Sequence, residues 1–210
     1  MKNTRQRILD AGRKLFNERG FSQVTVRMIA SELGMSSGNL NYHFRKREDI
    51  LEALYFEMVE VFDRRVEKLG EQEISLQLMR NDVEESLRRM LDYRFFWSDL
   101  YFILKANEKI HAHFLQAKEA RLKGYRYLYT FFIQQKILEK PSFAEEYNYL
   151  RERMLDYSNT CIYASELYAR EKDEARFIKR ASFQLISMLY PYFTVAGKKE
   201  FRELYPSFFA

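Results

Sequence analysis

Polar and cationic side chains are concentrated in one short stretch of this sequence, from residue 25 to residue 47. The middle of the stretch is a short predicted helix whose outward-facing side chains carry hydrogen-bonding groups. They are Ser37, Asn39, Asn41, Tyr42 and His43. Such groups can donate to and accept from the edges of nucleic-acid bases, and one α-helix fits the major groove of B-form DNA. The pattern therefore indicates a surface that reads bases.

Three consecutive cations, Arg45, Lys46 and Arg47, follow this polar surface and precede two acids, Glu48 and Asp49. Acidic side chains stabilise the positive end of a helix, so a further helix is predicted to begin here. The cations lie just before that end, and the free N–H groups of a helix N-terminus also attract anions. We expect this site to bind a phosphate group.

Two short helices must hold the polar surface in place. Thr25 is a good N-cap for the first, because its hydroxyl can accept from a free N–H group of the next turn. Met28, Ile29 and Leu33 then recur at near-helical spacing and give the helix an apolar face. Gly34 tolerates the left-handed backbone that commonly ends a helix, so the first helix is predicted to stop there.

The second helix is predicted to begin at Ser36 and Ser37. Leu40 and Phe44 lie four residues apart, so they share one face, and we expect that face to be buried. Two short helices joined by a tight turn and followed by a third are the layout of a helix-turn-helix unit. In such a unit the second helix enters the major groove of DNA.

Residues 1–50 resemble the N-terminal domain of the tetracycline-repressor (TetR/AcrR) family of bacterial regulators. The matching pieces, in chain order, are Ile8, Ala11, Leu15, Phe16, residues 19–21, 25–30, 33–36, 38–40, 42–44 and Arg47. Several anchored pieces in one order are a more specific signal than one short motif. The resemblance implies an all-α, homodimeric repressor controlled by a small ligand. It also implies a DNA-binding domain at residues 1–48 and a helical regulatory domain at residues 49–210, which binds the ligand and dimerises.

The resemblance also assigns roles to single residues. Arg27 matches a position that contacts bases in some members, and a bidentate pair between arginine and guanine is physically apt. Asn41 departs from the family, which usually has an aromatic residue there that touches a phosphate. We predict contacts to bases from Arg27, Ser37 and Asn39. We predict contacts to phosphate groups and the groove wall from Thr25, Asn41, Tyr42, His43 and Arg47.

The distribution of charge agrees with a DNA-binding head. The chain has 35 Lys and Arg against 30 Asp and Glu, a net charge of +5. Residues 1–50 hold 10 basic and 5 acidic side chains and so account for all of that excess, because residues 51–210 hold 25 of each. A basic head on a neutral body is typical of a protein that binds a polyanion.

The rest of the chain is predicted to be helical, because only 7 Gly and 3 Pro interrupt 210 residues. The expected helices cover about residues 49–69, 74–93, 95–106, 108–138, 142–170 and 172–193, with a short tail helix at 200–205. In this interpretation Gly70 and Gly197 separate helices, Ser142 caps one, and Pro191 bends or ends another.

Several other classes of protein are disfavoured. The sequence has no long apolar run and no secretory signal, and its single cysteine, Cys161, fits a reducing cytoplasm and a buried apolar role. His111 and His113 are two apart on a predicted helix, which is poor spacing for a shared metal. Gly-rich phosphate loops, Cys-x-x-Cys pairs and nucleophile elbows do not occur, so we expect no enzyme, metal or cofactor.

Aromatic side chains are unusually frequent in the body, with 15 Phe, 14 Tyr and one Trp after residue 50. They are densest at residues 94–102 and 124–132. Core packing accounts for most of them. The functional alternative is a cavity between helices for an apolar or planar ligand, and such a cavity is also what the family resemblance implies. We predict that Trp97, Tyr101 and Tyr129 line it.

The last long helices carry apolar stripes that can be core or partner surface. The candidate interface residues are Tyr157, Cys161, Ala181, Leu185 and Met188. Relatives dimerise by packing their last two long helices into a four-helix bundle. DNA reading favours the same arrangement, because two recognition helices related by a twofold axis read half-sites about 34 Å apart.

The prediction is therefore a cytoplasmic, nucleoid-associated transcriptional regulator. Its partners would be a palindromic DNA operator, a small effector and a second copy of the chain. Its function would be repression, relieved when the effector binds. One alternative is a DNA-anchored factor of the same fold whose body binds a protein instead of a small molecule. The sequence does not separate a repressor from an activator, because that depends on where the operator lies.

Overall fold

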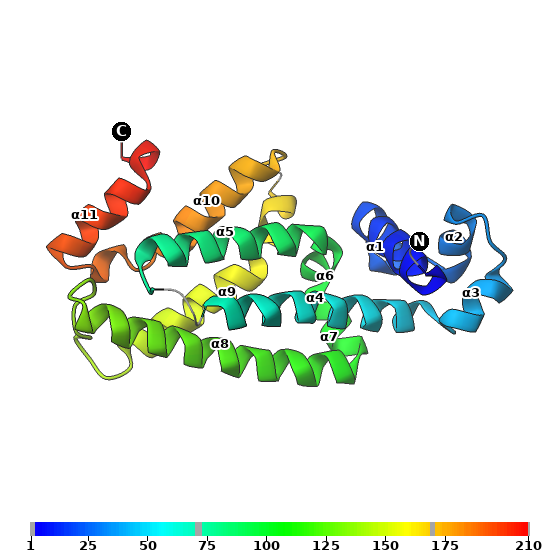
Figure 1. Ribbon diagram of the computed structural model, residues 1–210, viewed down its shortest axis with the longest axis horizontal. Helices are drawn as coiled ribbons and strands as arrows, with labels where there is room; N and C mark the ends of the chain where they lie inside the picture. Colours follow the sequence, from blue (N-terminus) through cyan, green and yellow to red (C-terminus); the bar gives the residue numbers. More distant parts are fainter. Residues whose placement is uncertain (1–2, 70–72, 169–170, 210) are drawn as a thin grey trace. The chain divides into compact units, whose positions relative to one another are not determined.

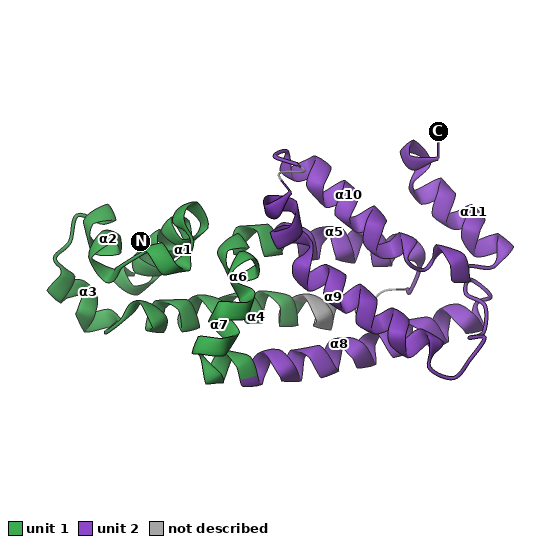
Figure 2. Cartoon of the chain, turned by 180° about the vertical axis from the view of Figure 1, so that it is seen from behind, with its two compact units in different colours: residues 1–70, 89–111 green, residues 71–88, 112–210 purple. Residues whose placement is uncertain are grey.

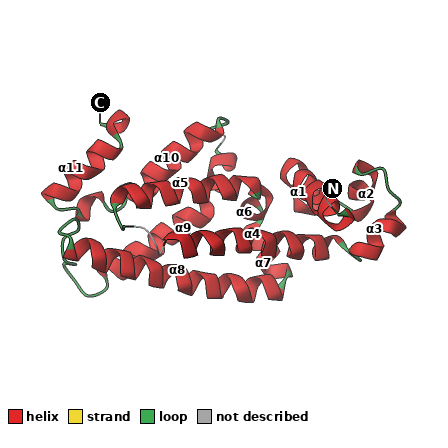
Figure 3. Cartoon of the chain, in the orientation of Figure 1, coloured by secondary structure: helices red, strands yellow, loops and turns green. Residues whose placement is uncertain are grey.

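The structure is a computed structural model that describes residues 3–69, 73–168 and 171–209, and their regular structure is helical (Figures 1 and 3). The longer helices are α1 Thr4–Arg19, α4 Arg47–Leu69, α5 Leu76–Asp92, α8 Glu108–Gln134, α9 Glu146–Leu167, α10 Glu174–Ser187 and α11 Val195–Leu204. The short ones are η1 Phe21–Gln23, α2 Val26–Glu32, α3 Ser37–His43, α6 Arg94–Ser98, α7 Leu100–Ala106, η2 Tyr190–Tyr192 and η3 Pro206–Phe208. Among the described residues, Leu138 and Phe193 form one isolated antiparallel β-bridge. The prediction of an all-α fold with an N-terminal helix-turn-helix and a helical C-terminal part is confirmed.

The chain packs as two compact units (Figure 2). The first unit combines residues 1–70 with residues 89–111, and the second combines residues 71–88 with residues 112–210. The predicted boundary at residue 48 separates a DNA-binding domain from a regulatory domain by their expected functions. The two compact units are defined by packing, so they do not test this boundary, and it stays a prediction.

The first unit is organised around α1. Asn3 caps this helix, because its Oδ1 accepts from the N–H of Gln6 at 2.8 Å. One face of α1 is buried, through Ile8, Leu9, Ala11, Gly12, Leu15 and Phe16. The helix packs against α2, α4 and α6. Gly12 allows the close approach to α4, since a Cβ atom there would lie 2.9 Å from Cγ2 of Ile50.

The helix predicted at residues 95–106 is broken in two. It ends as α6 at Ser98 and resumes as α7 at Leu100, with Asp99 between them at φ −104° and ψ 15°. The prediction of one continuous helix was wrong, because the backbone of Asp99 leaves the helical conformation. The side chain of Asp99 makes a contact that is distant in the sequence. Its Oδ2 accepts from the backbone N–H of Phe21 at 3.1 Å.

The second unit is tied together by two arginines. Arg151 of α9 is only 6% exposed, and its Nη1 donates to the carbonyl of Leu122 on α8 at 3.0 Å. Arg121 of α8 donates in return to Oγ of Ser158 at 2.6 Å and to Oδ1 of Asn159 at 2.8 Å. A buried charge is tolerated only when its donors are satisfied, so these bonds hold α8 and α9 in one register.

Several predicted helix boundaries were wrong. α9 begins at Glu146 and not at Ser142, and its predicted end at residue 170 lies outside the described residues. Gly70, the predicted end of α4, also lies outside them. The start of α10 agrees with the prediction, because Asp173 caps it and its Oδ1 accepts from the N–H of Arg176 at 2.8 Å. Its end does not, because α10 stops at Ser187 and not near residue 193.

Gly197 was predicted to separate two helices. This prediction was wrong, because Gly197 lies buried inside α11. The reason is a close backbone contact. A Cβ atom at this position would lie 2.3 Å from the carbonyl oxygen of Ile137. The same carbonyl accepts from the N–H of Thr194 at 3.0 Å, so it cannot move away cheaply. Only glycine fits where α11 crosses residue 137.

We expect Gly197→Ala to lower the free energy of unfolding by about 1–3 kcal/mol, because the added methyl group overpacks against backbone. Gly124→Ala is the matched control, since Gly124 lies inside α8 and an added Cβ would meet no other part of the described chain within 4 Å, apart from its own helix backbone and its two neighbours. Alanine is the better helix former, so this variant should gain about 1 kcal/mol. Urea denaturation followed by circular dichroism measures both. A Gly197→Ala protein as stable as the wild type would contradict this packing.

Candidate DNA-binding surface

The helix-turn-helix begins with a capped α2. The Oγ1 of Thr25 accepts from the N–H of Met28 at 3.3 Å, as predicted for an N-cap. Ile29 and Ala30 are buried and hold the helix against α1. Arg27 lies on the outer side of α2 and is exposed, so its guanidinium is available to a ligand.

The turn and the start of α3 follow the predicted pattern. Gly34 has φ +64°, the left-handed conformation that ends α2. Ser36 caps α3, because its Oγ accepts from the N–H of Asn39 at 3.2 Å. Leu40 is fully buried and Phe44 nearly so, which confirms the predicted inner face.

The outer face of α3 carries the predicted hydrogen-bonding side chains. Asn39, Asn41 and Tyr42 are exposed, and Tyr42 is 86% exposed with its ring edge against the ring of His43. Ser37 and His43 are half-buried. These side chains offer donors and acceptors to a ligand, so the face is suited to binding. The fold thus brings the α3 residues together beside the exposed Arg27 of the adjoining helix α2.

Arg47 has a structural role that the sequence did not reveal. Its Nη1 donates to three backbone carbonyls, those of Phe21 at 3.3 Å, Ser22 at 2.8 Å and Val24 at 3.1 Å. Its Nε donates to Glu48, and the guanidinium lies 4.7 Å from the centre of the Phe21 ring. The Nη2 atom makes no hydrogen bond to the described residues, so Arg47 can hold this turn and still offer the two N–H groups of Nη2 to a phosphate.

Further cations surround α3. Arg45 and Lys46 are exposed, and Asp49 caps the start of α4 by accepting from the N–H of Lys46 at 3.1 Å. Arg5, which the sequence analysis did not select, lies over the ring of Phe44 at 4.9 Å. Arg5 and Phe44 are 39 positions apart in the sequence, so no local sequence pattern could predict that Arg5 lies beside α3.

Acidic side chains limit how far a phosphate-binding surface can extend. A groove beside α3 is lined in part by Arg5, Tyr42, His43 and Arg45. Its α4 wall carries Asp49, Glu52, Glu57 and Glu60. Carboxylates repel phosphate groups, so the surface suited to DNA ends where this wall begins.

The predicted ligand-pocket residues differ in their surroundings. Trp97 of α6 is 6% exposed, and its indole N–H has no hydrogen-bond partner in the described part of the chain. Tyr101 of α7 is 68% exposed, with its ring edge against Phe102. Tyr129 of α8 is buried, its hydroxyl donates to the sulfur of Met154 at 2.8 Å, and burial raises its pKa. Trp97 and Tyr101 belong to one compact unit and Tyr129 to the other, so a shared pocket stays a prediction.

The predicted interface residues are mostly core residues of a single chain. Cys161, Ala181 and Leu185 are buried, whereas Tyr157 and Met188 are half-exposed. Burial raises the pKa of the Cys161 thiol to about 11, which fits the predicted inert role. Tyr163 and Leu167, four residues apart on α9, are about half exposed and were not predicted. An interface between copies therefore stays a prediction.

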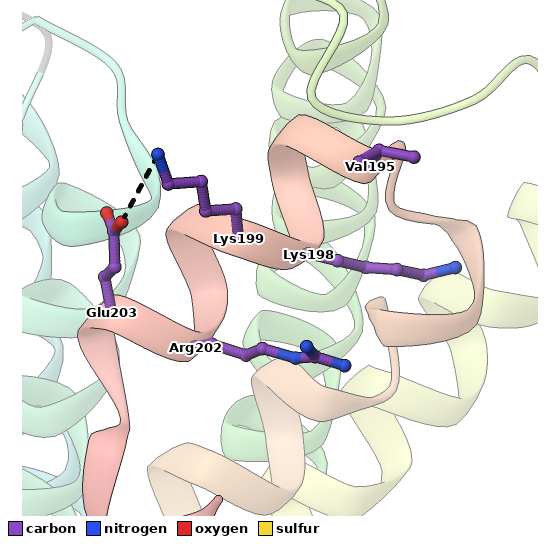
Figure 4. Close-up of a pocket in the computed structure, with 5 residues that line it drawn as sticks. All are labelled: Val195, Lys198, Lys199, Arg202 and Glu203. Carbon is purple, nitrogen blue, oxygen red and sulfur yellow. Dashed lines mark ion pairs between the residues drawn. The ribbon is translucent and has the colours of Figure 1, made fainter.

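A second concave surface lies on α11 (Figure 4). It is lined by Val195, Lys198, Lys199, Arg202 and Glu203. Its charges are used within the chain: Lys199 pairs with Glu203 at 3.9 Å, and Nε of Arg202 donates to the hydroxyl of Tyr190 at 3.1 Å. None of the predicted site residues lies here.

Neither a metal site nor a membrane span is found in the part of the chain that the structure describes. No three His, Cys, Asp and Glu side chains there are grouped as a metal ion requires. No helix among those residues is both long and apolar enough to cross a bilayer.

Comparison with known families covers most of the chain. Residues 8–54 match the family described as "Bacterial regulatory proteins, tetR family", and residues 57–201 match the one described as "Bacterial transcriptional repressor". An HTH-type transcriptional repressor of Mycobacterium tuberculosis is 32% identical over 77 residues, which are 37% of this chain and 39% of that protein. The chain thus spans well under two thirds of this curated relative.

Solved structures share the fold over nearly the whole length. A TetR-family regulator from Marinobacter aquaeolei superposes with a TM-score of 0.86 at 21% identity, covering 97% of each chain. A regulator from Saccharomonospora viridis in complex with choline gives 0.68 at 21% identity, covering 90% of this chain and 97% of that one. FadR from Bacillus subtilis in complex with stearoyl-CoA gives 0.62 at 18% identity, covering 87% and 98%.

Proposed function

This chain belongs to the TetR family of bacterial transcriptional regulators, and we propose that it is a repressor that leaves its DNA operator when a small ligand binds. The observation that carries the proposal is the α3 helix, capped by Ser36 and anchored by Leu40, whose outer face presents hydrogen-bonding side chains. That arrangement suits the major groove, where donors and acceptors distinguish the base pairs.

The proposed contacts divide by chemistry. Arg27, Ser37 and Asn39 lie where they can meet base edges. Phosphate groups and the groove wall are met by a second set, Thr25, Asn41, Tyr42, His43 and Arg47. For Arg47 the donor is Nη2, because the other nitrogens are engaged within the protein. Base contacts specify the sequence, whereas phosphate contacts set register and supply affinity.

We propose a homodimer that reads a palindromic operator, because one seven-residue helix offers too few contacts for tight and selective binding. The half-exposed Tyr163 and Leu167 of α9, together with Tyr157 and Met188, support a surface for the second copy. The buried Cys161, Ala181 and Leu185 would support that surface from within.

We propose that the effector is a small molecule with an apolar or aromatic body, bound near Trp97. The buried indole N–H, which lacks a partner among the described residues, supports this, because an unsatisfied buried donor costs about 1–3 kcal/mol. A ligand with a hydrogen-bond acceptor would remove that cost. Regulators of similar fold bind choline and stearoyl-CoA, so the fold accepts ligands of different chemistry. Tyr101, which lies in the same compact unit as Trp97, is part of this proposal as a pocket residue, and Tyr129 is proposed as a pocket residue of the other unit.

Release follows from a population shift. The effector must bind the state that does not fit DNA more tightly than the state that does. In our proposal α4, which begins at the helix-turn-helix, changes its direction in that state, and the two heads no longer match the spacing of the half-sites. The protein acts in the cytoplasm, on the nucleoid, and uses no cofactor and no catalytic step.

A second candidate is a DNA-anchored factor whose body binds a protein. Tyr101 and Phe102 favour it, because these adjacent aromatic side chains of α7 are 68% and 72% exposed. Exposed apolar side chains gathered in one place mark surfaces for partners. In this case no small molecule would change the affinity for the operator.

Selection of bound duplexes from a random DNA pool tests the function, with purified protein at near-physiological salt. We expect enrichment of a twofold-symmetric site whose half-sites are centred about 34 Å apart, one helical turn. Binding that is only salt-sensitive, without an enriched sequence, would sink the proposal of a sequence-reading regulator.

Asn39→Ala should relax sequence choice at one position of each half-site. A lost base contact costs about 1–3 kcal/mol against the preferred sequence and little against random DNA. Fluorescence anisotropy with the selected duplex and a scrambled duplex measures the ratio. Equal losses on both duplexes would remove Asn39 from the base-contact set.

Arg47→Ala should weaken binding to every duplex and reduce the salt dependence, with a slope of log K against log salt lower by about one. Lys199→Ala is the matched control, because this cation of α11 is exposed and lies in the other compact unit. An unchanged slope for Arg47→Ala would show that Arg47 acts only by holding the turn at residues 21–24.

A further inference from the structure

Two cations of α11 extend from the same side of the helix. Lys198 and Arg202 lie four residues apart and point the same way, whereas Lys199 points away from them, toward Glu203 (Figure 4). In the part of the chain that the structure describes, no carboxylate lies within ion-pair distance of Lys198 or Arg202. Like charges at this spacing on a helix repel each other. An anion bound between the two side chains would remove that repulsion.

Both cations reach one aromatic side chain, Tyr190 of η2. The Nζ of Lys198 lies 5.9 Å from the centre of the Tyr190 ring. The Nε of Arg202 donates to the Tyr190 hydroxyl at 3.1 Å, so this hydroxyl is an acceptor and still has its own proton to donate. Neither that proton nor the two terminal nitrogens of Arg202 make a hydrogen bond to the described residues. An ammonium, a guanidinium and a phenol thus gather with hydrogen bonds left to donate.

Apolar surface adjoins these donors. Val195 lines the same concave surface and is almost fully exposed. The ring of Phe209 is partly exposed, lies 5.8 Å from the Tyr190 ring and has the Arg202 guanidinium 5.6 Å from its centre. A site with donors on one side and apolar side chains on the other suits a molecule that has an anionic group and an apolar or planar body.

The donors match a phosphate group in number and in type. The planar guanidinium of Arg202 can donate to two phosphate oxygens side by side, and Lys198 adds a compact charge. A phosphate monoester has three free oxygens for three donor groups, whereas a carboxylate has two. The concave surface has a volume of about 380 Å³, and all the residues that line it belong to α11. This size suits a small molecule better than a polymer.

We propose that Lys198, Arg202 and Tyr190 form a binding site for a small phosphate monoester with an apolar or planar body. The two cations neutralise the phosphate, the Tyr190 hydroxyl donates a further hydrogen bond, and Val195 and Phe209 contact the body. The site goes beyond the proposed function. It needs no operator, and it lies in the second compact unit, whereas Trp97 belongs to the first.

Isothermal titration calorimetry with the full chain tests this site. The probe is phenyl phosphate, and inorganic phosphate and phenol represent its two parts. Lys198→Ala and Arg202→Gln each remove one of the proposed charges. Lys199→Ala is the matched control, because it removes the same charge from the next position of the same helix, where the side chain points toward Glu203. Circular dichroism shows whether each variant is folded.

We expect the wild type and Lys199→Ala to bind phenyl phosphate with affinities within about twofold, since an exposed charge that does not touch the ligand is screened by salt. Lys198→Ala and Arg202→Gln should each weaken binding by about tenfold, because each loses a hydrogen bond between charged groups. Inorganic phosphate and phenol should both bind more weakly than phenyl phosphate, because each offers only one of the two parts.

Equal losses in Lys198→Ala and Lys199→Ala would overturn the inference, because the attraction would then come from net charge and not from a site. A wild type that does not bind phenyl phosphate at millimolar concentration would overturn it too, as would inorganic phosphate or phenol bound as tightly as phenyl phosphate. Random duplex DNA that loses affinity in Lys198→Ala, without binding of phenyl phosphate, would assign this face of α11 to nucleic acid instead. These results do not involve an operator, so they are separate from a failure of the proposed function.

Discussion

The structure depends on holding one seven-residue helix, α3, in a defined place while most of its surface stays polar. A helix of this length has no stability of its own, so its position must come from neighbours. Leu40 and Phe44 supply the apolar anchor, and Ser36 satisfies a free N–H at its start. Arg47 then secures the turn before α2 through three backbone carbonyls. These few contacts free the outer face of α3 for a ligand.

Polar bonds also join α1 to the other helices of its unit. Asn17 of α1 binds the start of α6, and Asp99 at the end of α6 accepts from the N–H of Phe21. The Tyr93 hydroxyl donates to Glu57 of α4 at 2.7 Å while accepting from Arg13 of α1. Hydrogen bonds depend on geometry more steeply than apolar contacts do. A unit held in this way has preferred positions for its helices, which is the property that a ligand-controlled switch needs.

The aromatic residues of the body serve more than one purpose. Many of them, such as Phe132, Phe193 and Phe201, are buried and form the core of the second unit. Trp97 differs from them, because its indole N–H is buried and has no partner among the residues that the structure describes. Apolar packing explains the first group completely. It does not explain a retained polar group, and this difference is why we place the effector near Trp97 and not near the larger aromatic core.

The sequence by itself determined the all-α class, the family and the helix-turn-helix, because each of their signals lies within a few residues. Thr25, Gly34, Ser36 and Leu40 act on neighbours within the same turn or helix. Only the tertiary structure decided the break at Asp99, the burial of Gly197 and the three carbonyls held by Arg47. Their partners are 78, 60 and 23–26 positions away in the chain. Local spacing carries no information about contacts at that separation, since they arise only when the whole chain has packed.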